Sequence, residues 1–217
     1  MKTYHKIQTI YKRDPKNKNK TLLEGEFSMP EFEFLKDNKW IFTEKVDGTN
    51  IRVMYNGFEL KYGGKTDAAQ IPATLVNVLR ELFDNKREEF ARMFSVDIEK
   101  EGLPRVCLYG EGYGPKIQKG GGKYGDQQDF VLFDVKVGDW WLKRDDVVDV
   151  ATQLGVRVVP IIGEGPLFLM VEICREGFKS QWGDFQAEGI VARPEVELFS
   201  RNGGRIITKL KCKDFAR

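Results

Sequence analysis

Polar and apolar residues alternate on both sides of Asn56-Gly57, in the stretch IRVMYNGFELKY at residues 51–62. This alternation is typical of strands with one buried face, and Asn-Gly favours the type I′ turn of a two-residue hairpin. We therefore predict a β-hairpin here. Shorter apolar runs predict further strands, at residues 104–112, 129–137, 156–162, 188–194 and 205–213.

Other segments place their apolar residues at the helical period. Residues 72–94 have this pattern and predict an amphipathic helix, which can break at Asp84-Asn85. Residues 144–154 and 166–178 predict two more helices, with a glycine after the first and a proline at the start of the second.

A short helix is predicted after Ser28, because Ser28 and Glu31 have the spacing of a capping box and Pro30 suits a first turn. Hairpin-linked strands with helices between them predict an α+β fold, with antiparallel sheets flanked by helices and not a βαβ repeat. The 217 residues can bury a substantial core, and we expect one domain over residues 1–217.

Composition narrows the chemistry that the chain can perform. His5 is the only histidine, so histidine-based zinc sites and Ser-His-Asp triads are poor explanations. Three cysteines without a close pair suggest neither a disulfide framework nor a CxxC metal site. No run approaches the roughly 18 apolar residues of a membrane span, and the start lacks a signal peptide. We therefore expect a cytoplasmic protein.

Net charge is only +2, yet basic residues gather at residues 11–20 and 201–213. Such patches suit a phosphate-rich partner without a high global charge. Two nucleotide motifs fail on spacing. The GGKT at residues 63–66 lacks the first glycine of a P-loop, and GEGYG at residues 110–114 lacks the third glycine of a dinucleotide fingerprint.

The stretch EKVDG at residues 44–48 places Lys45 between Glu44 and Asp47. Most such clusters are solvated ion pairs. If the stretch ends a strand, Lys45 and Asp47 point to one face and can share a pocket. A lysine amine attacks phosphorus only when unprotonated, and acidic neighbours alone favour the protonated form. A reactive Lys45 therefore implies a metal ion held by the carboxylates through water.

Five segments together resemble a known family. They are EKVDGTNIRV, LYGEGYG, FVLFDV, EGIVAR and KLKCKDF, in the order and spacing of motifs I, III, IIIa, IV and V of the covalent nucleotidyltransferases, which are polynucleotide ligases and capping enzymes. The chain most closely resembles the phage-type ATP-dependent RNA ligases. The resemblance implies a ligase-type adenylation domain, and because the chain ends just after motif V, we expect no OB-fold domain.

By this resemblance, Lys45 is the nucleophile that becomes Lys-AMP. Glu111 holds the ribose, Phe133 stacks on adenine beside Asp134, and Glu188 with Asp47 organises the metal's water shell. The implied metal set, through water, is Asp47, Glu111 and Glu188. Glu44 and Asn50 complete the implied nucleotide-binding set.

The resemblance assigns Lys209 and Lys211 to phosphate contact and leaving-group orientation. With Lys213 they have the i, i+2, i+4 spacing of one strand face, which is costly unless an anion lies against it. Lys213 can also be merely solvated. Either Arg52 or Lys65 is expected to bind a phosphate, and a lysine there would lack the two-pronged contact of arginine.

The implied cofactors are ATP and Mg²⁺ or Mn²⁺, and the implied partners are nucleic acid ends with a 3′-hydroxyl and a 5′-phosphate. Asn50, where DNA ligases usually have arginine, favours RNA over DNA. A minimal DNA ligase, a GTP-using capping enzyme and an inactive nucleic-acid-binding module remain alternatives. The family further implies RNA repair and a phage origin, and leaves open whether the substrate is a nick, a tRNA break or a splinted junction.

Overall fold

The computed structural model describes residues 3–94 and 105–215, and these residues form two compact units. Of the described residues, the first unit contains 3–4, 47–94 and 105–159, and the second contains 5–46 and 160–215. Each unit has its own sheet and its own apolar core. The single domain expected over residues 1–217 remains a prediction, because two compact units can be lobes of one domain.

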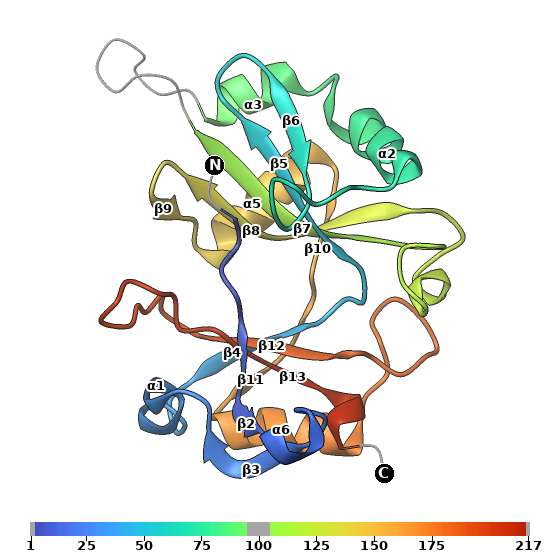
Figure 1. The fold of residues 1–217 in the computed structure, drawn as a ribbon. Helices are drawn as coiled ribbons and strands as arrows, with labels where there is room; N and C mark the ends of the chain where they lie inside the picture. The colour runs from blue at the N-terminus through green and yellow to red at the C-terminus, as the bar shows by residue number, and fades with distance from the viewer. Residues whose placement is uncertain (1–2, 95–104, 216–217) are drawn as a thin grey trace. The chain divides into compact units, whose positions relative to one another are not determined.

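The first unit is built on a six-stranded sheet (Figure 1). The main path runs in the order β10-β8-β7-β5-β6, and β9 pairs off this path with the last two residues of β8, Lys136 and Val137. All pairs are antiparallel except β10 with β8, which are joined through α5 as one βαβ crossover. The strands are β5 (Thr49–Tyr55), β6 (Leu60–Gly63), β7 (Val106–Tyr113), β8 (Asp129–Val137), β9 (Trp140–Trp141) and β10 (Arg157–Val158).

Helices of the first unit bury their apolar stripes against this sheet. The helix predicted over residues 72–94 breaks at the expected point, into α2 (Ala73–Phe83) and α3 (Arg87–Met93). The third, α5 (Arg144–Leu154), ends as predicted at Gly155, whose φ of 61° is readily adopted only by glycine. A short 3₁₀ turn, η2 (Gly121–Lys123), lies in the glycine-rich segment.

The predicted hairpin is present, but its turn is longer than predicted. Tyr55 pairs with Leu60, so four residues connect β5 and β6 instead of two. The Asn56 side-chain oxygen accepts hydrogen bonds from the backbone N–H groups of Phe58 and Glu59, at 3.0 and 2.9 Å. This side-chain capping closes a wider loop than the type I′ turn that Asn-Gly favours.

The second unit contains a five-stranded sheet with the order β1-β13-β12-β4-β11 and a separate two-stranded ribbon of β2 and β3 (Figure 1). Only the edge pair of β1 with β13 is parallel. The two sheets therefore confirm the predicted α+β class with mainly antiparallel strands. The strands are β1 (Gln8–Thr9), β2 (Tyr11–Arg13), β3 (Leu22–Phe27), β4 (Trp40–Glu44), β11 (Ile161–Gly165), β12 (Gly189–Pro194) and β13 (Thr208–Lys211).

Helix α6 (Leu167–Glu176) packs on β12 and β13, and it begins after Pro166 as predicted. Its buried side chains join the core of the second unit, around Trp40 and Phe42. Two 3₁₀ turns complete this unit, η1 (Pro15–Asn17) and η3 (Cys212–Asp214).

The short helix α1 (Pro30–Phe34) is present, but the predicted capping box is wrong. Met29 is the N-cap residue, and no side chain caps the helix. The Ser28 hydroxyl donates instead to the backbone carbonyl of Thr9, 19 residues earlier in the chain. The Ser28 hydroxyl, which the local sequence pattern assigned to a helix cap, therefore bonds to Thr9 in another segment.

Two predicted strands differ from the observed ones. The strand expected over residues 156–162 is divided at Pro160, with β10 before it in the first unit and β11 after it in the second. The strand expected over residues 205–213 ends at Lys211, where η3 begins. Pro104, where the strand at residues 104–112 was expected to begin, lies outside the described residues. Among the described helices, none is long and apolar enough to cross a membrane.

Candidate active site

Lys45, Glu188 and Lys211 come together in the second unit, where β4 and β13 end and β12 begins. Lys45 follows the last residue of β4, and its N–H donates to the carbonyl of Gly189 at 2.9 Å. Gly189 in turn pairs with Lys211, at the end of β13. The antiparallel pairing of β4, β12 and β13 therefore brings residues from three distant segments to the same end of the sheet.

The carboxylate of Glu188 bridges the two lysines. Its Oε2 lies 2.5 Å from Nζ of Lys45, and its Oε1 lies 2.5 Å from Nζ of Lys211. The side chains of Lys45, Glu188 and Lys211 are 20%, 11% and 27% exposed, so all three are partly withdrawn from water. Two cations share one anion, which leaves an excess positive charge for a ligand anion to neutralise.

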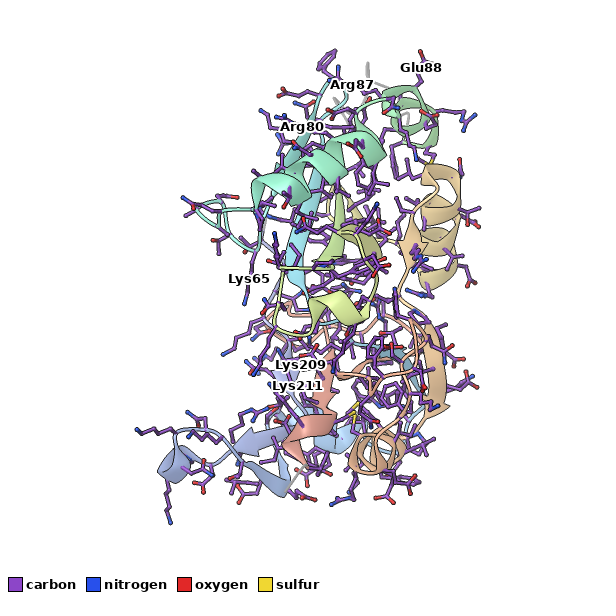
Figure 2. The ribbon with its side chains drawn as sticks, turned by 90° about the vertical axis from the view of Figure 1, so that its right-hand side faces the viewer. Lys65, Arg80, Arg87, Glu88, Lys209 and Lys211 are labelled. Carbon is purple, nitrogen blue, oxygen red and sulfur yellow. The ribbon has the colours of Figure 1, made fainter. Side chains whose placement is uncertain are left out.

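Lys209 lies on the same strand as Lys211 (Figure 2). Leu210 between them is fully buried, so alternation places both lysines on the opposite face of β13. The expectation that Lys213 continues this row is wrong. Lys213 lies in η3, beyond the end of the strand, and is exposed.

Glu44 is 1% exposed and is held by a loop that follows α6. Its Oε1 accepts a hydrogen bond from the Ser180 hydroxyl at 2.5 Å, and its Oε2 accepts one from the backbone N–H of Gln181 at 2.8 Å. Burial raises the pKa of Glu44 above its ordinary value, and the two hydrogen bonds act against this rise. Sequence reasoning missed Ser180 and Gln181, which carry no local signal of this contact.

In the first unit, Asp47 is fixed through its backbone. Its N–H donates to the hydroxyl of Tyr124 at 2.9 Å, and the amide of Gln118 donates to the carbonyl of Gly48 at 3.3 Å. Both partners come from the glycine-rich segment at residues 116–129. Tyr124 is buried, so its hydroxyl holds the backbone of Asp47 in a defined position. Sequence reasoning did not identify Tyr124 or Gln118.

Gly48 is required by crowding from the neighbouring strand β7. A Cβ atom at Gly48 would lie 2.3 Å from the carbonyl oxygen of Gly112 and 2.7 Å from Cγ of Glu111. Real Cβ atoms do not approach backbone this closely. The glycine therefore allows the chain after Asp47 to lie directly against the strand that carries Glu111.

Asn50 on β5 lies directly opposite Glu111 on β7. The side-chain oxygen of Asn50 is buried and accepts no hydrogen bond from any described residue. A buried acceptor of this kind usually has a partner, so this atom fits a donor on a bound molecule, such as a ribose hydroxyl or an ordered water. The ribose contact predicted for Glu111 remains a prediction.

Arg52 and Lys65 have different environments, although both were candidates for phosphate binding. The Arg52 side chain is fully buried, its Nε donates to the carbonyl of Gly64 at 2.8 Å, and its Nη2 lies 2.7 Å from Asp67. Lys65, between these two contacts, lies on the loop after β6 and is exposed (Figure 2). Arg52 therefore holds the loop that carries Lys65, and the phosphate contact of either residue remains a prediction.

Phe133 is half-buried on β8, and the ring of Tyr4 meets it edge-on at 5.1 Å between centroids. The hydroxyl of Tyr4 donates to the buried carboxylate of Asp134 at 2.5 Å. Tyr4 therefore contacts both Phe133 and Asp134, and the sequence analysis did not identify it. The stacking of Phe133 on adenine remains a prediction.

The three carboxylates predicted to hold a metal through water lie in different parts of the chain. Asp47 and Glu111 belong to the first unit, and Glu188 belongs to the second. Among residues 3–94 and 105–215, no group of three or more His, Cys, Asp or Glu side chains forms a direct metal site. Carboxylate oxygens that keep water between themselves and the ion are a chemistry suited to Mg²⁺.

Comparisons with known proteins identify the family. The family model for RNA ligase matches residues 38–211, which contain the first four motifs and the first three residues of the fifth. The chain therefore belongs to the RNA ligase family. A comparison with curated protein sequences finds no match.

Solved structures confirm the fold. Naegleria gruberi RNA ligase with PPi has a TM-score of 0.64 at 18% identity, covering 96% of this chain and 57% of that one. A mutant of the same ligase with ATP and Mn has a TM-score of 0.67 at 17% identity, covering 97% of this chain and 56% of that one. The chain thus spans just over half the length of these relatives. The described residues contain the two sheets of the RNA ligase fold and no OB-fold barrel.

Proposed function

We propose that the protein is an ATP-dependent RNA ligase that joins a 3′-hydroxyl to a 5′-phosphate through Lys45-AMP. The observation that carries this proposal is the bridge from Lys45 through Glu188 to Lys211, in a chain of the RNA ligase family. A half-buried lysine amine at a strand end, with a carboxylate and a second ammonium beside it, suits nucleophilic attack on a phosphate.

The first proposed step is the transfer of AMP from ATP to Lys45. The amine nitrogen forms a bond to the α-phosphorus, the bond to pyrophosphate breaks, and the amine loses a proton. Glu188 Oε2, at 2.5 Å, is placed to accept that proton. Lys209 and Lys211 would neutralise the departing pyrophosphate, which is the role that their shared face of β13 supports.

Two further steps complete the reaction. AMP moves from Lys45 to the 5′-phosphate of the nucleic acid, and the 3′-hydroxyl then attacks this activated phosphate and releases AMP. Catalysis consists mainly of in-line positioning and charge neutralisation. We assign the 5′-phosphate contact to Lys65, since Arg52 is committed to Gly64 and Asp67.

ATP and a divalent cation are the proposed cofactors. Naegleria gruberi RNA ligase variants have been solved with ATP and Mn and with AMP and Mn. In the first unit, the buried Asn50 oxygen fits a hydrogen-bond donor of a nucleotide, and in the second unit the two lysines of β13 fit phosphate groups. Asp47, Glu111 and Glu188 would hold Mg²⁺ or Mn²⁺ through water, and the ion would supply positive charge at the phosphates.

The adenylation assay tests this proposal. The protein is incubated with Mg²⁺ and α-labelled ATP, and a covalent protein-nucleotide adduct is measured after denaturation. We expect an adduct with the wild type and with the exposed-lysine control Lys36→Ala, and none with Lys45→Ala. No adduct with either ATP or GTP would overturn the proposal and favour a binding module, whereas an adduct with GTP alone would indicate a capping enzyme.

The substrate is tested with the adenylated protein. Nicked duplexes are offered with RNA or DNA on each side of the nick, beside a broken tRNA loop and a splinted junction. We expect sealing when the 3′-hydroxyl end is RNA, and sealing of all-DNA nicks alone would indicate a DNA ligase. A role in RNA repair, a phage origin and a cytoplasmic location belong to the same proposal and rest on the sequence.

A further inference from the structure

Cys174 and Cys212 are neighbours in the second unit, although 38 positions separate them in the sequence. Cys174 lies on α6 and is 1% exposed, and Cys212 begins η3 and is half-buried. Helix α6 packs against both β13 and η3, and the two cysteines share the apolar core of the second unit, close enough for each thiol to shift the pKa of the other. Both cysteines are free thiols.

This thiol pair adjoins the lysine pair of the candidate active site. Cys212 follows Lys211 directly, and its backbone N–H donates to the carbonyl of Glu188 at 3.0 Å. The thiol of Cys174 lies 3.8 Å from the carbonyl oxygen of Leu210. Residues 210–212 therefore carry both Lys211, which binds Glu188, and Cys212 of the thiol pair.

We propose that Cys174 and Cys212 form a peroxide-oxidised disulfide site, with Cys212 as the residue attacked first and Cys174 as the resolving thiol. Cys212 is the more exposed of the two, so peroxide reaches it first.

The reaction balances with one peroxide. The Cys212 sulfur forms a bond to a peroxide oxygen, the O–O bond breaks, and the released hydroxide takes the thiol proton as water. The product is a sulfenic acid. The Cys174 sulfur then attacks the Cys212 sulfur, the S–O bond breaks, and the leaving hydroxide takes the Cys174 proton as a second water. Two thiols lose two electrons, and peroxide gains them.

The disulfide would act on the ligase site through the backbone. Its sulfurs are about 2 Å apart, closer than any hydrogen-bonded pair of thiols, so Cys212 must move toward α6. That movement strains the hydrogen bond from Cys212 to Glu188 and displaces Lys211, the next residue. Because phosphoryl transfer depends on positioning, we infer that oxidation slows adenylation, and this consequence rests on the proposed ligase function.

The covalent claim is tested without an activity assay. The folded protein is treated with hydrogen peroxide, free thiols are alkylated, and peptides are mapped by mass spectrometry without reduction. We expect linked peptides containing Cys174 and Cys212, and their loss after dithiothreitol. Cys107 should stay reduced, and it should be alkylated once the protein is denatured, because burial raises its thiol pKa to about 11. Absence of the linked peptides, or oxidation of Cys107 at an equal rate, would overturn the site.

Two variants sharpen the mapping. In Cys174→Ser, the linked peptides should be absent and Cys212 should react with a sulfenic-acid reagent. In Cys212→Ser, Cys174 should stay reduced, because its buried thiol is protected when the first-attacked residue is missing. Oxidation of Cys174 in Cys212→Ser would reverse the assigned order and contradict the proposal.

The effect on the site is measured by Lys45-AMP formation. Oxidised wild type should form the adduct slower by on the order of tenfold or more, with recovery after dithiothreitol. Cys212→Ser should be unaffected by peroxide, and Cys107→Ser should behave as wild type. Full activity of a protein mapped as disulfide-linked would overturn the coupling. If even the reduced protein forms no adduct, the ligase proposal fails while peptide mapping still decides the disulfide.

Discussion

Oε2 of Glu188 lies 2.5 Å from Nζ of Lys45, and the two residues are 143 positions apart in the sequence. The pairing of β4 with β12 creates this contact, because it places the residues just before β12 beside those just after β4. An amine held this way has one defined neighbour to receive its proton and one defined direction of attack.

Glu188→Gln should therefore reduce adenylation strongly while the fold is retained. The amide keeps an oxygen near Lys45 but removes the negative charge that both lysines share, and its NH₂ group cannot accept a proton. We expect the rate of adduct formation to fall about 100-fold. The check is single-turnover adenylation beside urea unfolding, with the exposed Glu176→Gln as control. Equal rates in the two variants would contradict the role of Glu188.

Lys211→Ala and Lys213→Ala should differ sharply, although the two lysines are two residues apart. Lys211 ends β13 and contacts Glu188, whereas Lys213 is exposed in η3. We expect adenylation to fall by about 10- to 100-fold in the first variant and to stay near wild type in the second. Salt titration of ATP binding in both variants gives an independent measure, and similar losses would argue for a general basic patch.

Arg52→Met should destabilise the first unit. The change removes the donor to the Gly64 carbonyl, which is buried, and an unsatisfied buried carbonyl costs about 1–3 kcal/mol of unfolding free energy. Asp67→Asn breaks the same cluster from its exposed end, since Asp67 is 86% exposed, and should cost much less. Urea unfolding measures both, and a larger loss for Asp67→Asn would contradict the structural role of Arg52.

Tyr124→Phe should weaken catalysis more than stability. The variant removes the hydroxyl that accepts the Asp47 N–H, and we expect a stability loss of about 1 kcal/mol and a several-fold slower adenylation. Tyr113→Phe is the matched control, because Tyr113 packs against Tyr124 and its hydroxyl binds Asp129 instead. Equal adenylation in the two variants would show that Tyr124 does not position Asp47.

Glu44→Gln should change how stability depends on pH. Burial raises the pKa of Glu44 above its ordinary 4.5 in the folded state only. Between 4.5 and that raised value, the folded chain binds more protons than the unfolded chain, so wild-type stability falls as pH rises through this window. The variant cannot titrate there and should gain relative to wild type as pH rises. Urea unfolding from acidic to neutral pH, with exposed Glu33→Gln as control, measures the difference.

The sequence predicted those features whose cause is local. Apolar periodicity located α5 and α6, a break in that periodicity located the division between α2 and α3, and alternation located β5 and β6. The motif residues Lys45, Glu188 and Lys211 were also predicted from sequence, and the structure brings these three together. Their mutual contact follows from the order of β13, β12 and β4 in the sheet, which apolar periodicity does not predict.

The features that the sequence did not predict depend on partners far along the chain. Tyr124 meets Asp47 across 77 residues, and Ser180 meets Glu44 across 136. A single sequence contains no periodic or spacing signal for such pairs. Ser28 is similar, because its hydroxyl was assigned to a local cap and is used by Thr9 instead. Local rules identify which groups can bond, whereas tertiary packing decides which partner they find.

Gly48 serves folding and chemistry at the same position. A methyl group there would collide with the backbone of β7, so Gly48→Ala must either push Glu111 away or shift the chain at Asp47. An inactive Gly48→Ala protein would therefore say nothing about the reaction itself. Variant libraries would find this position intolerant even under a selection for expression alone, and only comparison of folded yield with adenylation per folded molecule can separate the two demands.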